Sequence, residues 1–303
     1  MTEAGDGPLV LCCHGFPELA YSWRHQITAL ADAGYHAVAP DQRGYGASSR
    51  PEQVAAYDIE HLTGDVLGIF DAFGVERAFV VGHDWGANVA WHTALRAPER
   101  VAGVVGMSVP FLPRPAAPPT QLLRMIFADV WFYILYFQAP GVAEADLGRD
   151  PSTTLRRLMC ATSGGGAPVA DPAVLVRDGQ GMVARLPEPD RLPNWLSEAD
   201  LSRYARAFSV TGFRGPLNWY RNIDRNWELT ELLAEAKITV PALFVTGEHD
   251  VVRMMSPDSV MDGWVTDLRR TVIVEGAGHW VQQERPDVVN SALVAFLDSV
   301  NAD

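Results

Sequence analysis

The chain has 303 residues, of which 48% are hydrophobic and 20% are charged, and its formal net charge is −13 at pH 7. This length allows one large domain with an insertion, and the composition is ordinary for a globular protein with a substantial core. The negative charge disfavours nucleic acid and anionic membrane surfaces as partners. The most apolar run, from 125 to 137, is too short to cross a bilayer. We therefore expect no membrane or nucleic-acid partner.

Cysteine usage and the start of the chain indicate a compartment. The three cysteines fit neither a disulfide framework nor a metal site, and the first residues lack the charged and then apolar pattern of a secretion signal. We expect a cytoplasmic protein that uses neither a metal nor another cofactor.

The first predicted strand is the apolar run Leu9 to Cys13, which ends at His14-Gly15-Phe16-Pro17. A loop in this position can direct a backbone N–H toward a nucleophile on a neighbouring strand. We expect Phe16 to supply such an N–H group and His14 to be structural. The next elements are a helix over 23–33, a strand over 35–40 and a helix over 59–73, on which Asp65 is expected to be a solvated or capping charge.

The central feature is the segment from Ala78 to Ala90, which predicts a strand, a sharp turn and a helix. Gly82 and Gly86 bracket the turn, as in the nucleophile elbow of α/β-hydrolases, where larger neighbours would clash with the strained central residue. The central residue here is Asp84. We expect the N–H of Trp85, at the start of the following helix, to join Phe16 as a second oxyanion donor.

An aspartate nucleophile indicates attack on a saturated carbon. The product of such an attack is an ester whose carbonyl belongs to the enzyme, so water can attack that carbonyl and regenerate Asp84. A serine would instead form an ether that water could not readily cleave.

After a predicted strand at 101–109 the alternation of strands and helices stops, and it resumes with a helix at 223–236 and a strand at 240–245. The intervening residues are rich in proline, glycine and aromatic side chains, which indicates an inserted helical lid over the sheet. We therefore expect core segments 1–111 and 223–303 and a lid at 112–222. Trp131 and Phe137 in the lid and Trp85 below it are predicted to contact an apolar substrate.

Two later loops complete a constellation with Asp84. Asp250 follows the strand at 240–245, and His279 lies on a glycine-containing loop after the last predicted strand, 270–274. The order nucleophile, acid, histidine is that of α/β-hydrolases. His249 is expected to be an exposed neighbour without a role.

At this point the sequence resembles the epoxide hydrolases of the α/β-hydrolase fold, such as the hydrolase domain of mammalian soluble epoxide hydrolase and its bacterial relatives. The resemblance covers nearly the whole chain and depends on five segments: His14-Gly15-Phe16-Pro17, Gly82-His83-Asp84-Trp85-Gly86, Tyr133 to Gly141, Arg214 to Trp227 and Gly278-His279-Trp280. It implies a mostly parallel sheet flanked by helices, with a helical cap, and the hydrolysis of an epoxide by water to a vicinal diol.

The resemblance also implies roles for individual residues. Asp84 would be the nucleophile, with Asp250 and His279 as charge relay and base. Tyr133 and Tyr220 would donate to the epoxide oxygen, with Tyr133 matching the family's tyrosine better than the nearby Tyr136. A cis peptide bond is implied before Pro17.

Two other functions remain open from the sequence. A haloalkane or haloacid dehalogenase shares the aspartate nucleophile but commonly uses a Trp or Asn near the oxyanion loop, where this chain has Phe16. A catalytically silent ligand-binding relative is disfavoured by the intact set of Asp84, Asp250 and His279.

The resemblance implies a strand hairpin before the strand at 9–13, and only eight residues precede that strand. We therefore expect the hairpin to be missing and the strand at 35–40 to have an unpaired edge, which a homodimer would cover.

Overall fold

The computed structural model describes residues 1–166 and 176–302, so residues 167–175 of the predicted lid lie outside the described part. Seven strands form one sheet in the order β1-β3-β2-β4-β5-β6-β7. They are β1 (Thr2–Ala4), β2 (Leu9–Cys13), β3 (His36–Ala39), β4 (Ala78–His83), β5 (Val101–Met107), β6 (Ala242–Gly247) and β7 (Leu268–Val274). Neighbouring strands are parallel except for β1 and β3. The predicted mostly parallel sheet is confirmed.

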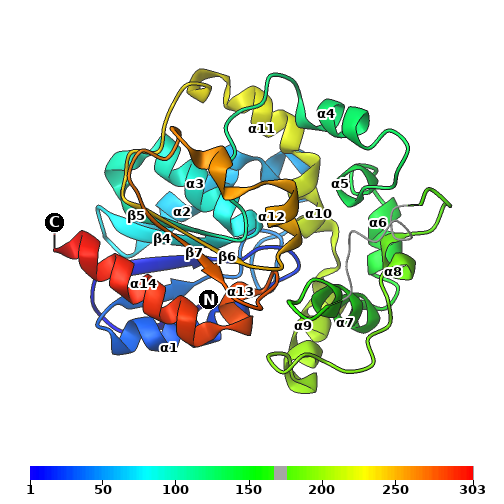
Figure 1. Cartoon of the computed structure of the whole chain (residues 1–303), viewed down its shortest axis with the longest axis horizontal. Helices are drawn as coiled ribbons and strands as arrows, with labels where there is room; N and C mark the ends of the chain where they lie inside the picture. Colours follow the sequence, from blue (N-terminus) through cyan, green and yellow to red (C-terminus); the bar gives the residue numbers. More distant parts are fainter. Residues whose placement is uncertain (167–175, 303) are drawn as a thin grey trace.

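Helices cover both faces of this sheet. Successive side chains of a strand point to opposite faces, so Val80 of β4 joins one hydrophobic core while Phe79 and Val81 join the other. The first core is closed by α2 (Ile59–Ala72) and α3 (Trp85–Arg96), and the second by α1 (Arg24–Asp32) and α14 (Pro286–Asn301). The sheet with helices on both of its faces, as predicted, is visible in Figure 1.

The insertion between β5 and β6 is helical, as predicted. It contains α4 (Pro119–Ile126), α5 (Tyr133–Tyr136), α6 (Val142–Leu147), α7 (Pro151–Ala161), α8 (Met182–Arg185), α9 (Glu198–Thr211) and α10 (Arg214–Arg221). Local sequence fixes several starts: Asp150 caps α7 ahead of Pro151, and Ser197 forms a capping box with Asp200 at α9. In Figure 1 helices α5 to α9 gather on the right, beside the sheet.

Shorter helices connect the remaining elements. The α-helical ones are α11 (Ile223–Leu229), α12 (Val251–Met255) and α13 (Val281–Glu284). The 3₁₀ helices are η1 (Ala20–Trp23), η2 (Val54–Tyr57), η3 (Pro98–Arg100), η4 (Glu231–Leu233) and η5 (Asp258–Met261). No helix in the described ranges combines the length and the apolar character that crossing a bilayer requires.

The expected open edge at β3 is wrong. The three residues of β1 pair antiparallel with β3, with Thr2 opposite Ala39 and Ala4 opposite Ala37. One strand is present where the resemblance implied a hairpin, and it supplies the backbone partners that β3 needs. β3 therefore has no unpaired edge that a homodimer would need to cover.

Asp65 is 41% exposed, as expected of a solvated charge, but it also has a partner that the sequence did not show. Its two carboxylate oxygens accept hydrogen bonds from Arg43, at 2.8 Å from Nε and 2.6 Å from Nη2. The pair joins α2 to the loop after β3, so Asp65 is neither a free surface charge nor a helix cap.

Candidate active site

Asp84 lies at the turn between β4 and α3, with φ of 53° and ψ of −120°. This left-handed conformation is uncommon for a residue with a side chain and indicates a strained turn. A Cβ at Gly82 would lie 2.0 Å from the carbonyl oxygen of Gly86, so only glycine fits there. The predicted nucleophile elbow is therefore present, with Asp84 at its apex.

The loop after β2 contacts the Asp84 carboxylate directly. The N–H of Phe16 donates to Asp84 Oδ1 at 2.8 Å, and the Phe16–Pro17 peptide bond is cis, as the resemblance implied. Trp85 is the first residue of α3, so its N–H belongs to the helix turn whose donors lack intrahelical partners. This geometry suits Phe16 to the oxyanion role, while the Trp85 N–H stays a predicted second donor.

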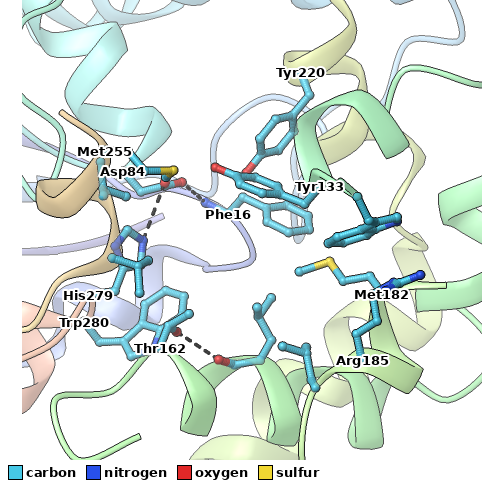
Figure 2. A pocket seen from close by; sticks show the side chains of 15 residues that line it. Phe16, Asp84, Tyr133, Thr162, Met182, Arg185, Tyr220, Met255, His279 and Trp280 are labelled. Carbon is cyan, nitrogen blue, oxygen red and sulfur yellow. Dashed lines mark hydrogen bonds and ion pairs between the residues drawn. The ribbon is translucent and has the colours of Figure 1, made fainter. Parts of the chain in front are cut away.

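Two further loops bring an acid and a histidine to the same carboxylate. His279 Nδ1 is 3.1 Å from Asp250 Oδ1. His279 Nε2 is 3.6 Å from Asp84 Oδ2, a contact that is drawn in Figure 2. Asp250 caps α12 by accepting from the N–H of Val252 at 2.9 Å, which fixes its side chain. The imidazole can therefore face a water molecule with one nitrogen while the other is held by a carboxylate.

The charges of this group shift one another's protonation. Burial disfavours the charged form of His279, but the carboxylates of Asp250 and Asp84 outweigh it and raise the pKa of the imidazole well above its usual value. Burial alone would raise the pKa of Asp250, but the neighbouring His279 lowers it. Asp250 is thus held as a carboxylate beside an imidazole that readily accepts a proton.

Two lid tyrosines face Asp84 from the other side. Tyr133 starts α5 and Tyr220 is on α10, with their ring centroids 6.1 Å apart, and Figure 2 shows both hydroxyl groups pointing toward Asp84. Burial, reinforced by the charge of Asp84, raises the pKa of both phenols. Tyr136 is directed elsewhere, because its hydroxyl donates to Asp146 Oδ2 at 3.2 Å.

The side chains of Asp84, His279, Tyr133 and Tyr220 line one cavity of about 100 Å³, and the other walls of this cavity are mostly apolar. It is lined by Phe16, Asp84, Trp131, Tyr133, Leu158, Thr162, Met182, Arg185, Leu186, Tyr220, Val251, Val252, Met255, His279 and Trp280. Small-molecule sites commonly combine such apolar walls with a few convergent polar groups.

The predicted substrate contacts divide into two groups. Trp131 lines the cavity, whereas Phe137 and Trp85 are not among the lining residues of the described chain. Phe137 is fully buried behind the wall, with its ring centroid 5.7 Å from that of Phe16 and 5.0 Å from that of Tyr220. The ring of Trp85 likewise packs edge-on against Tyr220 at 5.1 Å. Both aromatics support the lining side chains.

Sequence reasoning missed a buried pair behind the site. Glu18 and His83 are both completely buried, with Glu18 Oε2 2.6 Å from His83 Nδ1. The same carboxylate accepts a hydrogen bond from the N–H of Gly15. Burial alone would raise the pKa of Glu18, but His83 and the Gly15 N–H outweigh this effect and lower the pKa to about 2. The signal was present, since His83 precedes Asp84 and Glu18 follows the His14–Pro17 loop, but only the fold shows that they meet.

The main-chain carbonyl of His279 is also held from behind. It accepts from His83 Nε2 at 2.7 Å and from Ser108 Oγ at 2.8 Å. Ser108 itself has φ of 67°, a conformation that costs free energy and is found where surrounding structure enforces it. These contacts join the strand ends of β4 and β5 to the loop of the histidine.

The two other histidines singled out in the sequence have structural surroundings. His14 is buried and its Nε2 accepts the N–H of Gln42 at 3.0 Å, while the His249 side chain is 54% exposed. Among residues 1–166 and 176–302, no group of three or more His, Cys, Asp or Glu side chains is arranged to hold a metal ion.

Comparison with known proteins gives the same family at several levels. The profile of the alpha/beta hydrolase fold matches residues 8–286. Epoxide hydrolase A of Mycobacterium tuberculosis is 52% identical over 98% of this chain and 93% of its own length. The bifunctional epoxide hydrolase 2 of Mus musculus is 40% identical over 98% of this chain and 53% of its own length.

Solved structures agree with these matches. The crystal structure of epoxide hydrolase A from Mycobacterium thermoresistibile superposes with a TM-score of 0.93 at 53% identity, covering 98% of this chain and 93% of that one. An epoxide hydrolase from an endophytic Streptomyces gives a TM-score of 0.96 at 43% identity, with coverages of 99% and 92%. This chain therefore belongs to the α/β-hydrolase fold family and, within it, to the epoxide hydrolases.

Proposed function

We propose that this epoxide hydrolase opens an apolar epoxide with Asp84 and then hydrolyses the resulting ester with water, releasing a vicinal diol. The observation that carries the proposal is the convergence on one cavity of Asp84, His279 and the hydroxyl groups of Tyr133 and Tyr220. The enzyme–ester route follows from the carboxylate nucleophile, because an acyl carbonyl is then available for attack by water.

Ring opening uses the lid and the elbow together. Asp84 attacks one epoxide carbon, the carbon–oxygen bond of the ring breaks, and the released alkoxide takes a proton from Tyr133 or Tyr220. The raised pKa of both phenols keeps them protonated at neutral pH, so they can donate hydrogen bonds throughout this step. Such hydrogen bonds strengthen as negative charge develops on the oxygen.

Ester hydrolysis uses the other side of the cavity. His279, held by Asp250, takes a proton from the water that attacks the Asp84 acyl carbon, and the Phe16 N–H stabilises the oxyanion at Oδ1. One such donor contributes roughly 3 kcal/mol in comparable sites. The bond between the acyl carbon and the ester oxygen then breaks, and the departing diol oxygen takes the proton from His279. The second proton of the water returns to the tyrosine that protonated the alkoxide, so Asp84 is again a carboxylate. Esterification removes the Asp84 charge that raises the pKa of His279, so the imidazole is more readily neutral when it is needed as a base.

The proposal is tested by screening terminal, styrene-type and disubstituted epoxides for diol formation. We expect diol from at least one class with the wild type. With His279→Gln we expect the ester to accumulate and to appear as added mass on the intact protein. Full turnover by His279→Gln, or diol formation without any protein ester, would contradict the mechanism.

Dehalogenation is the nearest competing function. The paired phenols above Asp84 favour an oxygen leaving group, and Phe16 stands where dehalogenases commonly place a halide donor. Halide release from haloalkanes at a rate exceeding diol formation would reverse this assignment. Release of neither halide nor diol would favour a ligand-binding relative.

We further propose that the enzyme consists of an α/β-hydrolase core, formed by residues 1–111 and 223–303, and a helical lid formed by residues 112–222. Asp84, Asp250 and His279 come from the core segments, while Tyr133 and Tyr220 come from the lid.

The three cysteines are free and buried, which supports our placement of the enzyme in a reducing cytoplasm.

A further inference from the structure

The loop that carries His279 is hydrogen-bonded to main-chain carbonyl groups of the lid. The N–H of His279 donates to the carbonyl of Thr162 at 2.9 Å, and Trp280 Nε1 donates to the carbonyl of Met159 at 2.9 Å. Both acceptors belong to α7 or the turn that follows it. The base therefore takes part of its position from the lid as well as from the sheet.

One buried carboxylate joins these two segments. Glu284 ends α13, is 8% exposed and has no role in the chemistry described above. Its Oε1 accepts the N–H groups of Gly278 and Trp280, each at 3.1 Å. Its Oε2 accepts the N–H of Gly164 in the lid at 2.9 Å. The carboxylate thus holds the peptide groups on both sides of His279 and one peptide group of the lid.

The lid and the loop approach closely where Glu284 joins them. A Cβ at Gly164 would lie 2.1 Å from the carbonyl oxygen of Gly276, so the two backbones are in direct contact. Gly278 and Trp280 are buried and Gly164 is partly buried, and a buried N–H without a partner costs about 1 to 3 kcal/mol. The Glu284 carboxylate supplies acceptors for the N–H groups of all three residues.

We propose that Glu284 is a positioning residue for ester hydrolysis, which fixes the main chain of His279 against the lid so that the imidazole stays aligned with Asp84. Asp250 orients the ring, at 3.1 Å from Nδ1, but it lies on a different loop. His279 Nε2 is 3.6 Å from Asp84 Oδ2, and the attacking water must reach both the imidazole and the acyl carbon. A displacement of about 1 Å at such a site lowers a rate by roughly 100-fold.

Both side-chain oxygens of residue 284 must accept hydrogen bonds, because each faces at least one backbone N–H group. A glutamine at 284 would keep the size of the side chain but turn an NH₂ group toward one of the N–H donors, so at least one hydrogen bond would be replaced by a repulsive contact. Burial raises the pKa of Glu284, while the N–H groups of Gly164, Gly278 and Trp280 favour its carboxylate form. Glu284→Gln therefore removes the clamp with little change in volume.

The inference rests on the proposed function and is tested by measuring the two steps separately in Glu284→Gln. We expect the rate of ester formation to stay within about two-fold of wild type and the rate of ester hydrolysis to fall roughly 10- to 100-fold. With hydrolysis limiting, kcat and KM fall by the same factor, kcat/KM is unchanged, and the ester becomes visible by intact mass. A loss of folded protein alone would lower kcat without lowering KM.

Glu248→Gln is the matched control. The Glu248 carboxylate also accepts an N–H of this loop, that of Gly276 at 3.0 Å, but from the exposed side and away from His279. We expect both rates to be those of wild type. Glu284→Asp keeps the charge on a shorter side chain and replaces Glu284→Gln in this test if the glutamine variant does not fold. We expect Glu284→Asp to slow ester hydrolysis but not ester formation, by a smaller factor than that expected for Glu284→Gln.

Equal slowing of both steps, or wild-type hydrolysis in folded Glu284→Gln, would overturn the positioning role. So would a fall in kcat at constant KM. Failure of the proposed function is a different result, because the wild type itself would then form no ester.

Discussion

In the proposed cycle, the charge of Asp84 changes the pKa of His279. In the resting enzyme burial alone would lower the pKa of His279, but the carboxylates of Asp250 and Asp84, the proposed nucleophile, raise it. Once Asp84 is an ester its negative charge is gone, so only Asp250 continues to favour the imidazolium. The nucleophile thereby controls when its neighbour becomes a base.

The first prediction concerns the pH dependence of ester hydrolysis. This step needs neutral His279, so its rate should fall as pH drops through the pKa of His279 in the ester form and reach a plateau at higher pH. Ring opening does not need a neutral imidazole, so the ester should accumulate on the acid side. Single-turnover measurements between about pH 5 and pH 9 would show this. A hydrolysis rate independent of pH would exclude His279 as the base.

The second prediction concerns the two phenols. We expect Tyr133→Phe and Tyr220→Phe each to slow ester formation roughly 10- to 100-fold, and the double variant to be nearly inactive, because the alkoxide then lacks an acid. Tyr136→Phe is the matched control, since its hydroxyl donates to Asp146 outside the cavity lining. Wild-type ester formation in the double variant would show that another group protonates the oxygen.

At the level of elements, the separation of the phenols depends on how α5 is joined to α10. Arg221 at the end of α10 makes a two-pronged ion pair with Glu144 of α6, at 2.7 and 2.9 Å, and donates to the carbonyl of Phe137 at 3.1 Å. Gln138 donates to the carbonyl of Tyr220 at 3.0 Å. These contacts fix the segment after Tyr133 against the helix of Tyr220.

The third prediction follows from that ion pair. Glu144→Gln should lower the free energy of unfolding by about 1 to 3 kcal/mol, because the buried Arg221 guanidinium loses its charged partner. It should also slow ester formation about five-fold or more while sparing ester hydrolysis, which uses the other side of the cavity. Glu52→Gln is the control, because Glu52 is an 85% exposed partner of Arg214, which lies on α10 with Arg221. This variant should change neither the free energy of unfolding nor the rate of ester formation. Slowing of hydrolysis alone in Glu144→Gln would contradict this division of the site.

The strands and the elbow could be predicted from the sequence because their signals are local. β2 and β5 are continuous apolar runs, as buried parallel strands require, and the residues around Asp84 carry the turn pattern themselves. The side toward which Phe137 faces could not be predicted, since it depends on how α5 rotates against Phe16 and Tyr220. The pairs Arg43–Asp65 and Glu18–His83 also join separate elements, so only the packed fold brings them together.

At the level of the whole molecule, the sheet brings distant loops to one edge. The ends of β4, β6 and β7 place Asp84, Asp250 and His279 together because parallel strands end at the same side of a sheet. One side margin of the sheet, beyond β3, is formed by β1. The sequence predicted the first arrangement from chain order, but it did not show that three residues suffice to pair with β3.

The fourth prediction concerns that margin. Removing residues 1–4 should lower the free energy of unfolding by roughly 1 to 3 kcal/mol in urea denaturation and expose β3 to self-association. It should leave kcat unchanged, because no residue assigned to catalysis precedes His14. Glu3→Gln keeps the backbone pairing and removes only the contact with His36, so it should cost less than about 0.5 kcal/mol. Unchanged stability after the truncation would show that β1 does not support the sheet.

The ester on Asp84 is tested most directly by one turnover in water labelled with heavy oxygen, using enzyme in excess over epoxide. We expect Asp84 to supply the oxygen that enters the diol in that first turnover and the labelled water oxygen to remain on the carboxylate. Mass spectrometry should therefore find unlabelled diol and a labelled peptide containing Asp84. Labelled diol and an unlabelled peptide from the first turnover would mean that water attacks the epoxide directly, and the account of this site would be wrong.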